Sequence, residues 1–313
     1  MLTKHDEMKA AAGYLRCDRR TARVDASWSL AAERAEDVTS AVASGRLAPA
    51  TMGWSATLID GVAVTFSRLY VGDEFCQQLI PSGRELESMI ELADSRHVPV
   101  TLATPPVTDD GLDGLGPALR ALADRPAAEV LVNDWGTLRH VHRLFPELRK
   151  VLGRVLHREA KDPRASGRHA TASLTEPYVT LLRRFGVSML SLDRLPADES
   201  PLPLAVHLPY EFVTAGRACV ISGVAFPEPK KFRSDFACPR PCRTLFLDLR
   251  SSDPRVEMRQ KGNALYAGNG GTSLISSAAG RVARWVYDLS VDKAYSLFAS
   301  SETSHEVESP RAV

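Results

Sequence analysis

GVAVTFSRLYVGDEFCQQLIPSGRELESMIELADSRHVPVTLAT, residues 61–104, contains a complete strand–helix–strand unit. Residues 61–72 and 97–104 predict strands, and the apolar spacing in 83–96 predicts an amphipathic helix. Short parallel strands joined by helical crossovers form either a doubly wound sheet or a barrel, and periodicity alone does not choose between them. The same alternation continues downstream, with helices expected at 113–126, 135–145 and 175–186 and strands at 127–134, 150–158 and 187–192.

Both ends of the chain differ from this pattern. The Ala- and Glu-rich stretch 27–45 predicts a helix that ends at Gly45 and is capped by Ser29 or Asp25. We therefore expect residues 1–50 to be an N-terminal extension, partly helical or disordered, and the polar residues 299–313 to be a disordered tail. These boundaries leave 51–298 as the main domain.

The alternation also breaks inside that domain, after residue 212. Residues 242–269 predict strands and turns, and the next long helix is expected at 276–289. The segment from Leu192 to Cys219 is short for a strand–helix–strand unit, which indicates that one helix is missing.

Composition excludes little. The 313 residues carry a net charge of +1 and are 44% hydrophobic, enough for a sizeable core. This charge gives no reason to expect nucleic acid or an anionic membrane as an obligatory partner. No apolar run approaches a membrane span, and the polar residues 1–10 lack a signal-peptide core. Free thiols then predict a reducing, cytoplasmic location.

Four of the five cysteines are candidate metal ligands: Cys76, Cys219, Cys238 and Cys242. The last two bracket Pro239-Arg240-Pro241, which cannot form a helix, so their thiols extend from a stiff loop. Cys17, in the charged segment LRCDRR, is expected to be a spare accessible thiol.

Cations surround these cysteines and predict thiolates, because positive charge lowers a thiol pKa. An iron–sulfur cluster is one possible occupant, and a structural zinc ion is another, although zinc sites usually use two short cysteine pairs. A third interpretation makes Cys76 and Cys219 small buried apolar residues. The cations are Arg217, Lys230, Lys231, Arg233, Arg240 and Arg243.

The motifs around the cysteines, LYVGDEFC (69–76), AGRAC (215–219) and CPRPC (238–242), resemble in order and separation the UbiV branch of the U32 peptidase-like family. Tyr70, Gly72 and Glu74 match the residues that precede the first ligand of that branch, and Arg217 precedes the second. The resemblance covers roughly residues 60–290. It implies a TIM-like (β/α) barrel, incomplete or distorted, in which Cys76, Cys219, Cys238 and Cys242 bind a 4Fe-4S cluster.

The resemblance also implies a function. UbiV-like proteins act with a homologous UbiU-like subunit in the oxygen-independent hydroxylation of a small aromatic precursor, ubiquinone biosynthesis being the family case. A heterodimeric hydroxylase subunit is therefore expected. The alternatives are hydroxylation of a tRNA base or a specialised metabolite, a non-catalytic Fe-S or zinc scaffold, and a U32-like peptidase.

Polar residues at predicted strand ends are candidates for the mouth of such a barrel. Asn133 and Asp134 end one strand, and the resemblance includes an acidic residue there. Asp134 is equally suited to cap the following helix. Trp135 can stack on an aromatic substrate or serve as a packing residue.

The segment LHREAKDPR (156–164) places several charges after the next predicted strand. His157 and Arg158 lie on opposite faces of an extended segment, so one of them points inward. With Arg164 they form a candidate clamp for a carboxylate. A solvated basic loop is the alternative.

The remaining candidates are Asp134, Arg158 and Glu211 for catalysis, of which Glu211 with Phe212 resembles the Glu-x-Phe signature of the wider family. His207 is interpreted as a core histidine. The sequence has no phosphate-binding loop, dinucleotide fingerprint, His-Glu-x-x-His or Gly-x-Ser-x-Gly motif, so a peptidase would lack a recognisable nucleophile.

Overall fold

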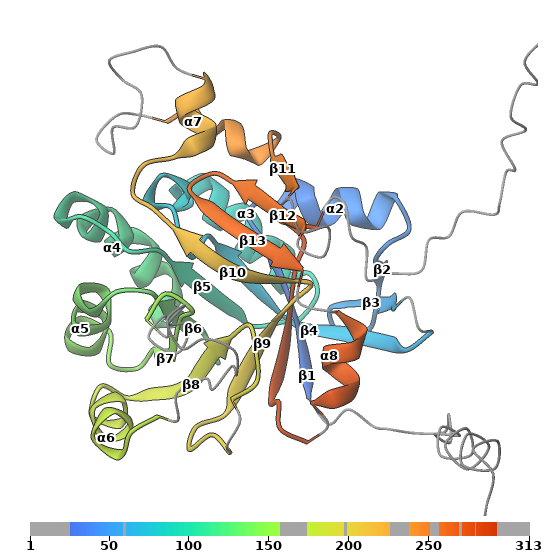
Figure 1. The fold of residues 1–313 in the computed structure, drawn as a ribbon. Coiled ribbons are helices and arrows are strands. Elements are labelled where there is room, and N and C mark those ends of the chain that lie inside the picture. Colours follow the sequence, from blue (N-terminus) through green and yellow to red (C-terminus); the bar gives the residue numbers. More distant parts are fainter. Residues whose placement is uncertain are drawn as a thin grey trace, which may run out of the picture.

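Eight parallel strands close into a barrel in this computed structural model, which describes residues 26–58, 61–156, 174–196, 199–225, 238–250, 257–268, 271–278 and 280–292 (Figure 1). The first barrel strand pairs with both the second and the last, which closes the sheet. The expected TIM-like barrel is therefore confirmed, with a complete set of strands. Around the barrel they are β1 (Ser27–Ala32), β4 (Ala63–Gly72), β5 (Val100–Thr104), β6 (Glu129–Val132), β7 (Arg149–Leu152), β8 (Val187–Leu192), β9 (Leu204–Leu208) and β14 (Arg284–Asp288).

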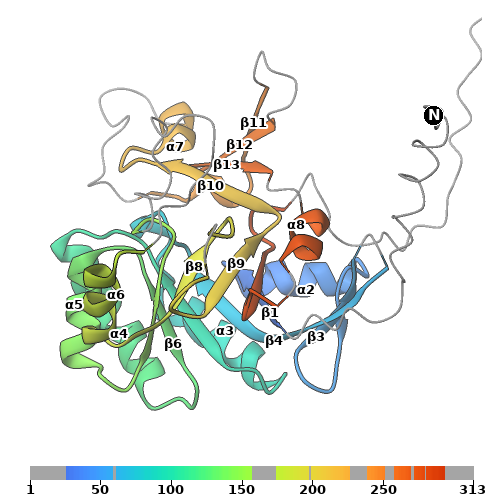
Figure 2. The same ribbon diagram turned by 60° about the horizontal axis from the view of Figure 1, so that its bottom comes forward.

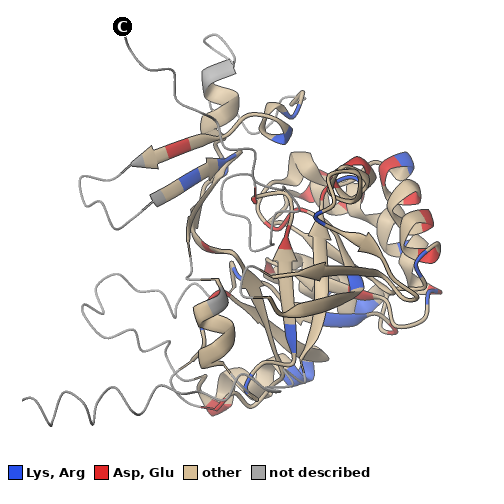
Figure 3. Ribbon diagram, turned by 90° about the vertical axis from the view of Figure 1, so that its right-hand side faces the viewer, with Lys and Arg blue, Asp and Glu red and all other residues tan. Residues whose placement is uncertain are grey.

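Helices cover the outside of the barrel (Figure 2). Across the connection from β8 to β9, the described residues include no helix, as the short sequence predicted. Acidic and basic residues are interspersed along the outer helices (Figure 3). These helices are α2 (Ala35–Ala43), α3 (Gly83–Asp94), α4 (Asp109–Ala123), α5 (Trp135–Leu144), α6 (Glu176–Arg184) and α8 (Thr272–Ser277).

The N-terminal boundary at residue 50 is wrong. Within the expected helix 27–45, residues Ser27–Ala32 form β1, and the helix α2 starts only at Ala35, with Arg34 at the N-cap position instead of Ser29 or Asp25. Strand β1 pairs with β4 and β14, so it is part of the barrel and not of an extension. The Ala- and Glu-rich composition favoured a helix, but burial between two strands overrides that preference.

The long helix expected at 276–289 is also wrong. Helix α8 ends at Ser277, and the last barrel strand β14 follows. Gly280 separates them with a φ of +75°, a left-handed conformation that glycine adopts without strain. Trp285, Val286 and Tyr287 are fully buried in β14, where aromatic and β-branched residues fit a strand. Residues 1–25 and 299–313 lie outside the described residues.

Apolar side chains fill both faces of the barrel sheet. The larger cluster lies between the strands and the outer helices, and a smaller one fills the interior. The parallel strands are therefore buried on both sides, as their apolar runs require. The interior cluster comprises Tyr70, Leu131, Val151, Ala205 and Val286.

An insertion between β9 and α8 lies against one end of the barrel (Figures 1 and 2). It begins at the carboxyl end of β9, and its Tyr210, Phe212 and Tyr266 pack on Phe75, which follows β4. The insertion therefore lies at the carboxyl ends of the strands, the face that carries the active site in barrels of this type. Its antiparallel sheet has the order β10 (Tyr210–Ala215), β13 (Ala264–Gly268), β12 (Glu257–Lys261) and β11 (Leu247–Arg250), accompanied by α7 (Val220–Ala225) and the 3-10 turn η3 (Pro241–Arg243).

A short hairpin of β2 (Ala48–Pro49) and β3 (Trp54–Thr57) pairs antiparallel with β4 outside the barrel, and the 3-10 turn η1 (Gln77–Leu79) follows β4. Among the described residues, no helix is both long and apolar enough to cross a membrane.

Candidate functional site

The four candidate cysteines line one pocket of about 960 Å³, including its open mouth. Cys76 follows β4 and precedes η1, Cys219 precedes α7, and Cys238 and Cys242 lie on the loop that contains η3. Cys76 and Cys219 are more than a hundred residues apart in the sequence. The closed barrel returns the chain to its carboxyl face, where the three cysteines of the insertion line the same pocket as Cys76.

Backbone contacts hold the thiols in place. Asp73 Oδ1 accepts hydrogen bonds from the N–H groups of Phe75 (2.8 Å) and Cys76 (2.7 Å), which fixes the turn after β4. Arg240 has a φ of +58°, and this left-handed residue reverses the chain between Cys238 and Cys242. Its N–H lies 3.4 Å from Cys238 Sγ.

Cys219 has a similar contact: the N–H of Ser222 lies 3.2 Å from its Sγ. Such N–H donors stabilise charge on sulfur and are one of the means by which proteins tune a bound iron–sulfur cluster.

The expectation that nearby cations favour thiolates is wrong for the metal-free protein. Burial raises the pKa of Cys76 and of Cys219, and raises that of Cys242 to about 12. Two of the expected cations, Arg240 and Arg243, are already paired, because both contact Glu85. Lys230, Lys231 and Arg233 lie outside the described residues. Metal binding must therefore displace protons from the thiols.

The chemistry of the donor set fits a metal centre, because four cysteine thiols line one pocket. All four thiols are free of disulfides. Within the described part of the chain, no three His, Cys, Asp or Glu side chains lie close enough together to hold one metal ion. Four thiolates are the ligand set of structural zinc sites and of 4Fe-4S clusters alike.

A buried polar cluster beside this pocket was missed by the sequence analysis. Arg154 donates to Glu74 Oε1 from Nε (3.0 Å) and Nη2 (2.7 Å), and to Asp193 Oδ1 from Nη1 (2.8 Å). Their side chains are only 3%, 6% and 1% exposed. Burial alone would lower the pKa of Arg154, but the two carboxylates raise it above its usual value. Arg154 is therefore a permanent cation.

The sequence feature that could have predicted this cluster is that each of its charged residues comes directly after a barrel strand. Glu74, Arg154 and Asp193 each follow a barrel strand by one or two residues. The expected strand 150–158 was too long: β7 ends at Leu152, so Arg154 lies at the mouth and not within a strand. His157, Arg158 and Arg164 lie outside the described residues, as does Cys17.

Asn133 is part of the polar cluster. It is buried, its Nδ2 donates to Thr104 O (3.0 Å) and lies 3.4 Å from Glu74 Oε2, and its Oδ1 accepts from the N–H of Val155 (3.0 Å). It therefore connects the ends of β4, β5, β6 and β7.

The two residues after Asn133 have other roles. Asp134 caps α5, because its carboxylate accepts from Thr137 N (2.7 Å) and Thr137 Oγ1 (2.6 Å). Trp135 is 43% exposed and packs edge-on against Tyr178 on the outer surface, away from the residues that line the pocket.

Glu211 lies on β10 and forms an ion pair with Arg194, with 2.6 Å between Glu211 Oε1 and Arg194 Nη2. It does not line the cysteine pocket. His207 is buried in β9, where its Nε2 lies 2.7 Å from Ser191 Oγ and 3.6 Å from Glu74 Oε1. In a Ser-His-acid triad the serine and the acid contact opposite ring nitrogens, whereas here both lie near the same nitrogen of His207. Ser191 is also fully buried, so these three residues do not have the geometry of a catalytic triad.

A second, smaller cavity of about 350 Å³ lies toward the barrel interior. Phe75 lines both cavities. Its ring stacks on Phe212 with 4.4 Å between centroids, and the Arg154 guanidinium lies 5.1 Å from its centroid on the polar side. One aromatic ring therefore separates the thiols from the buried charges.

No protein-family model, curated protein or solved structure matches this chain. The likeness to the UbiV branch therefore rests on the cysteine motifs, and the site is interpreted from its own geometry.

Proposed function

We propose that this chain binds a 4Fe-4S cluster through Cys76, Cys219, Cys238 and Cys242 and acts in the oxygen-independent hydroxylation of a small aromatic molecule. The observation that carries the proposal is the convergence of four free thiols on one pocket at the carboxyl face of the barrel. Four thiolates are the usual ligand set of such clusters. When bound, the cluster supplies one-electron redox chemistry.

The apolar part of the pocket lining suits an aromatic substrate. Pro106, Val155 and the stacked rings of Phe75 and Phe212 line it, and they would exclude water from a ring held beside the cluster. Behind Phe75, the Glu74–Arg154–Asp193 cluster supplies fixed charges. Asn133 is the predicted substrate residue that lies nearest to this arrangement.

We further propose a UbiU-like partner subunit and a role in ubiquinone-type biosynthesis. The cysteine motifs support both, through their resemblance to the UbiV branch. Exposed apolar side chains on the cysteine-bearing insertion, Val213, Val220, Leu245 and Leu249, support a partner that covers this sheet.

The test is metal analysis of protein purified without air. We expect a brown protein with about four irons and four sulfides per chain. Serine substitution of Cys76, Cys219, Cys238 or Cys242 should each reduce cluster content, whereas Cys17→Ser should leave the absorbance unchanged. Stoichiometric zinc, with no iron taken up on reconstitution, would contradict the cluster and leave a zinc scaffold.

Activity requires a second experiment. The loaded protein, co-expressed with a UbiU-like homologue, should form a complex and hydroxylate a ubiquinone precursor under anaerobic conditions. A stable complex without hydroxylation would contradict the assigned substrate but not the cluster.

A further inference from the structure

Glu85 connects the barrel to the cysteine loop, although it touches no thiol. It lies in the first turn of α3, where Ser82 and Glu85 form a capping box: Ser82 N donates to Glu85 Oε2 (2.9 Å), and Glu85 N donates to Ser82 Oγ (3.4 Å). The capping interaction fixes the carboxylate at the start of the helix. Glu85 lies nine residues after Cys76 in the sequence.

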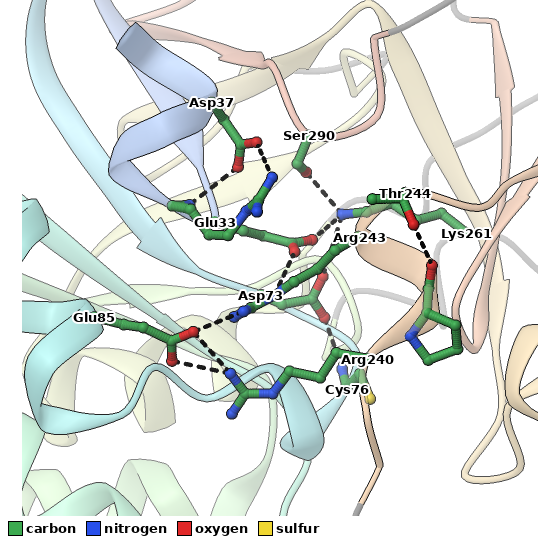
Figure 4. Close-up of polar contacts among 12 residues, drawn as sticks. Glu33, Asp37, Asp73, Cys76, Glu85, Arg240, Arg243, Thr244, Lys261 and Ser290 are labelled. Carbon is green, nitrogen blue, oxygen red and sulfur yellow. Dashed lines mark hydrogen bonds and ion pairs between the residues drawn. The ribbon is translucent and has the colours of Figure 1, made fainter. Parts of the chain in front are cut away.

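Two arginines of the cysteine loop meet this carboxylate. Arg240 Nη1 lies 2.9 Å from both oxygens of Glu85, and Arg243 Nη1 lies 2.7 Å from Oε1. Figure 4 shows both guanidinium groups pointing at Glu85 from the same loop. Arg240 lies between Cys238 and Cys242, and Arg243 follows Cys242 directly, so one carboxylate holds the whole cysteine pair.

Arg240 also contacts the chain segment that carries Cys76. Arg240 Nη2 donates to the carbonyl of Ile80 (3.3 Å), four residues after Cys76. Together these contacts join residues 76–85 to residues 238–243, the two segments that carry three of the four cysteines of the pocket.

Glu85 is ionised whenever the thiols are reactive. Burial would raise its pKa, but hydrogen bonds from the Ser82 backbone, Arg243 and Arg240 outweigh this and lower the pKa to about 2. Charged hydrogen bonds of this kind are stronger than neutral ones.

The rest of the insertion has its own attachment. Lys261, on β12, contacts Glu33 after β1, donates to Ser290 Oγ (2.9 Å) and lies 3.9 Å from Asp73 Oδ2 (Figure 4). Arg243 also lies 3.9 Å from Glu33, so losing the Glu85 contacts would loosen the cysteine loop while the sheet stays attached to the barrel.

We propose that Glu85 is a positioning residue that holds the Cys238–Cys242 pair opposite Cys76 by pairing with Arg240 and Arg243. The proposal rests on the proposed function only in treating the four cysteines as one ligand set.

The test uses metal-free, reduced protein, so it does not depend on whether a cluster forms. In a Cys17→Ser background, dibromobimane, which joins two neighbouring thiols, is added and the joined peptides are identified by mass spectrometry. Glu85→Gln keeps a side chain that can complete the capping box but removes its charge. The matched control is Glu87→Gln, an exposed residue of the same helix.

We expect Glu85→Gln to lower the yield of the cross-link between Cys76 and the loop about fivefold, the effect of one good ion pair. The Cys238–Cys242 cross-link within the loop should not change, and Glu87→Gln should match the parent. Arg240→Gln/Arg243→Gln should cause at least the same loss, because it also removes the contacts with the Ile80 carbonyl and with Glu33. Adding Glu85→Gln to the double variant should cause no further loss, since the interaction with the two arginines is already gone. A merely structural role of Glu85 in α3 would instead give an additional loss.

An unchanged Cys76 cross-link in Glu85→Gln, or no such cross-link in the parent, would overturn the proposal. If Glu85→Gln does not fold, the double arginine variant decides, because it leaves α3 intact: a full yield there overturns the proposal as well. A Glu85-dependent cross-link in a protein that takes up no iron would support the positioning role and contradict the cluster.

Discussion

Replacing Arg154 by methionine should destabilise the fold strongly, because it removes the cation shared by two buried carboxylates. Glu74 and Asp193 are 6% and 1% exposed, and together they accept three hydrogen bonds from Arg154. Breaking a buried charge cluster by removing one partner costs about 3–5 kcal/mol, since the two carboxylates lose the buried cation that they share. The loss of the cation above the Phe75 ring adds about 0.5–1 kcal/mol.

The assay is urea denaturation followed by circular dichroism, with the free energy of unfolding taken by linear extrapolation. The triple variant Arg154→Met/Glu74→Gln/Asp193→Asn should recover most of the loss, because it removes the charges together. The control is Arg143→Met on the exposed side of α5, which should change stability by less than about 0.5 kcal/mol.

A loss below about 1 kcal/mol in Arg154→Met would refute this reasoning, because it would mean that the cluster is hydrated or that the carboxylates find another partner. A triple variant less stable than the single would also refute it. In that case the residues would contribute through shape and packing instead of charge.

Two further predictions concern stability. Burial raises the pKa of Asp292 to about 7, so the folded protein binds the proton of this carboxyl group more tightly than the unfolded chain does. The resulting stabilisation is complete below the ordinary carboxyl pKa of about 4 and is lost as the pH rises through 7. Asp292→Asn should reduce the change in the free energy of unfolding between pH 4 and 8 by about 2–4 kcal/mol, measured by denaturation at each pH. The control Asp113→Asn, at an exposed position, should leave this change as it is in the parent. Gly53 and Gly61 both have positive φ, but a Cβ on Gly53 would lie 1.7 Å from the Phe66 carbonyl oxygen whereas one on Gly61 would meet no atom within 4 Å. Thermal denaturation should therefore show a loss of about 1 kcal/mol for Gly61→Ala and about 3 kcal/mol or more for Gly53→Ala; equal losses would show that the backbone near Phe66 yields easily.

Much of the barrel could be predicted from local pattern. The apolar run of β4, the amphipathic spacing of α3 and the strands β5 and β8 lie within a few residues of where periodicity predicted them. These elements bury a regular stripe or face, so neighbouring residues carry the signal. The capping role of Asp134 was one of the two predicted alternatives for the same reason, because a cap involves only the next turn.

The ends of the barrel could not be predicted in this way. Ser27–Ala32 has a composition that suits a helix, and it is a strand because β4 and β14 lie on either side of it. The segment of β14 was misread for the same reason. Closure of the sheet brings the first and last strands together, and neither segment carries that information alone.

The sequence by itself determined which residues are candidate ligands: four cysteines in recognisable motifs, two of them on a loop that proline keeps from becoming a helix. Only the tertiary structure decided their environment. It brought them to one pocket, buried Cys76, Cys219 and Cys242 so that the pKa of each of these three thiols rises, and paired Arg240 with Glu85, a residue 155 positions away in sequence. The reason is physical. The ability of a thiol to bind a metal belongs to one side chain, whereas burial and the pairing of charges depend on every segment that the closed barrel brings to the same face.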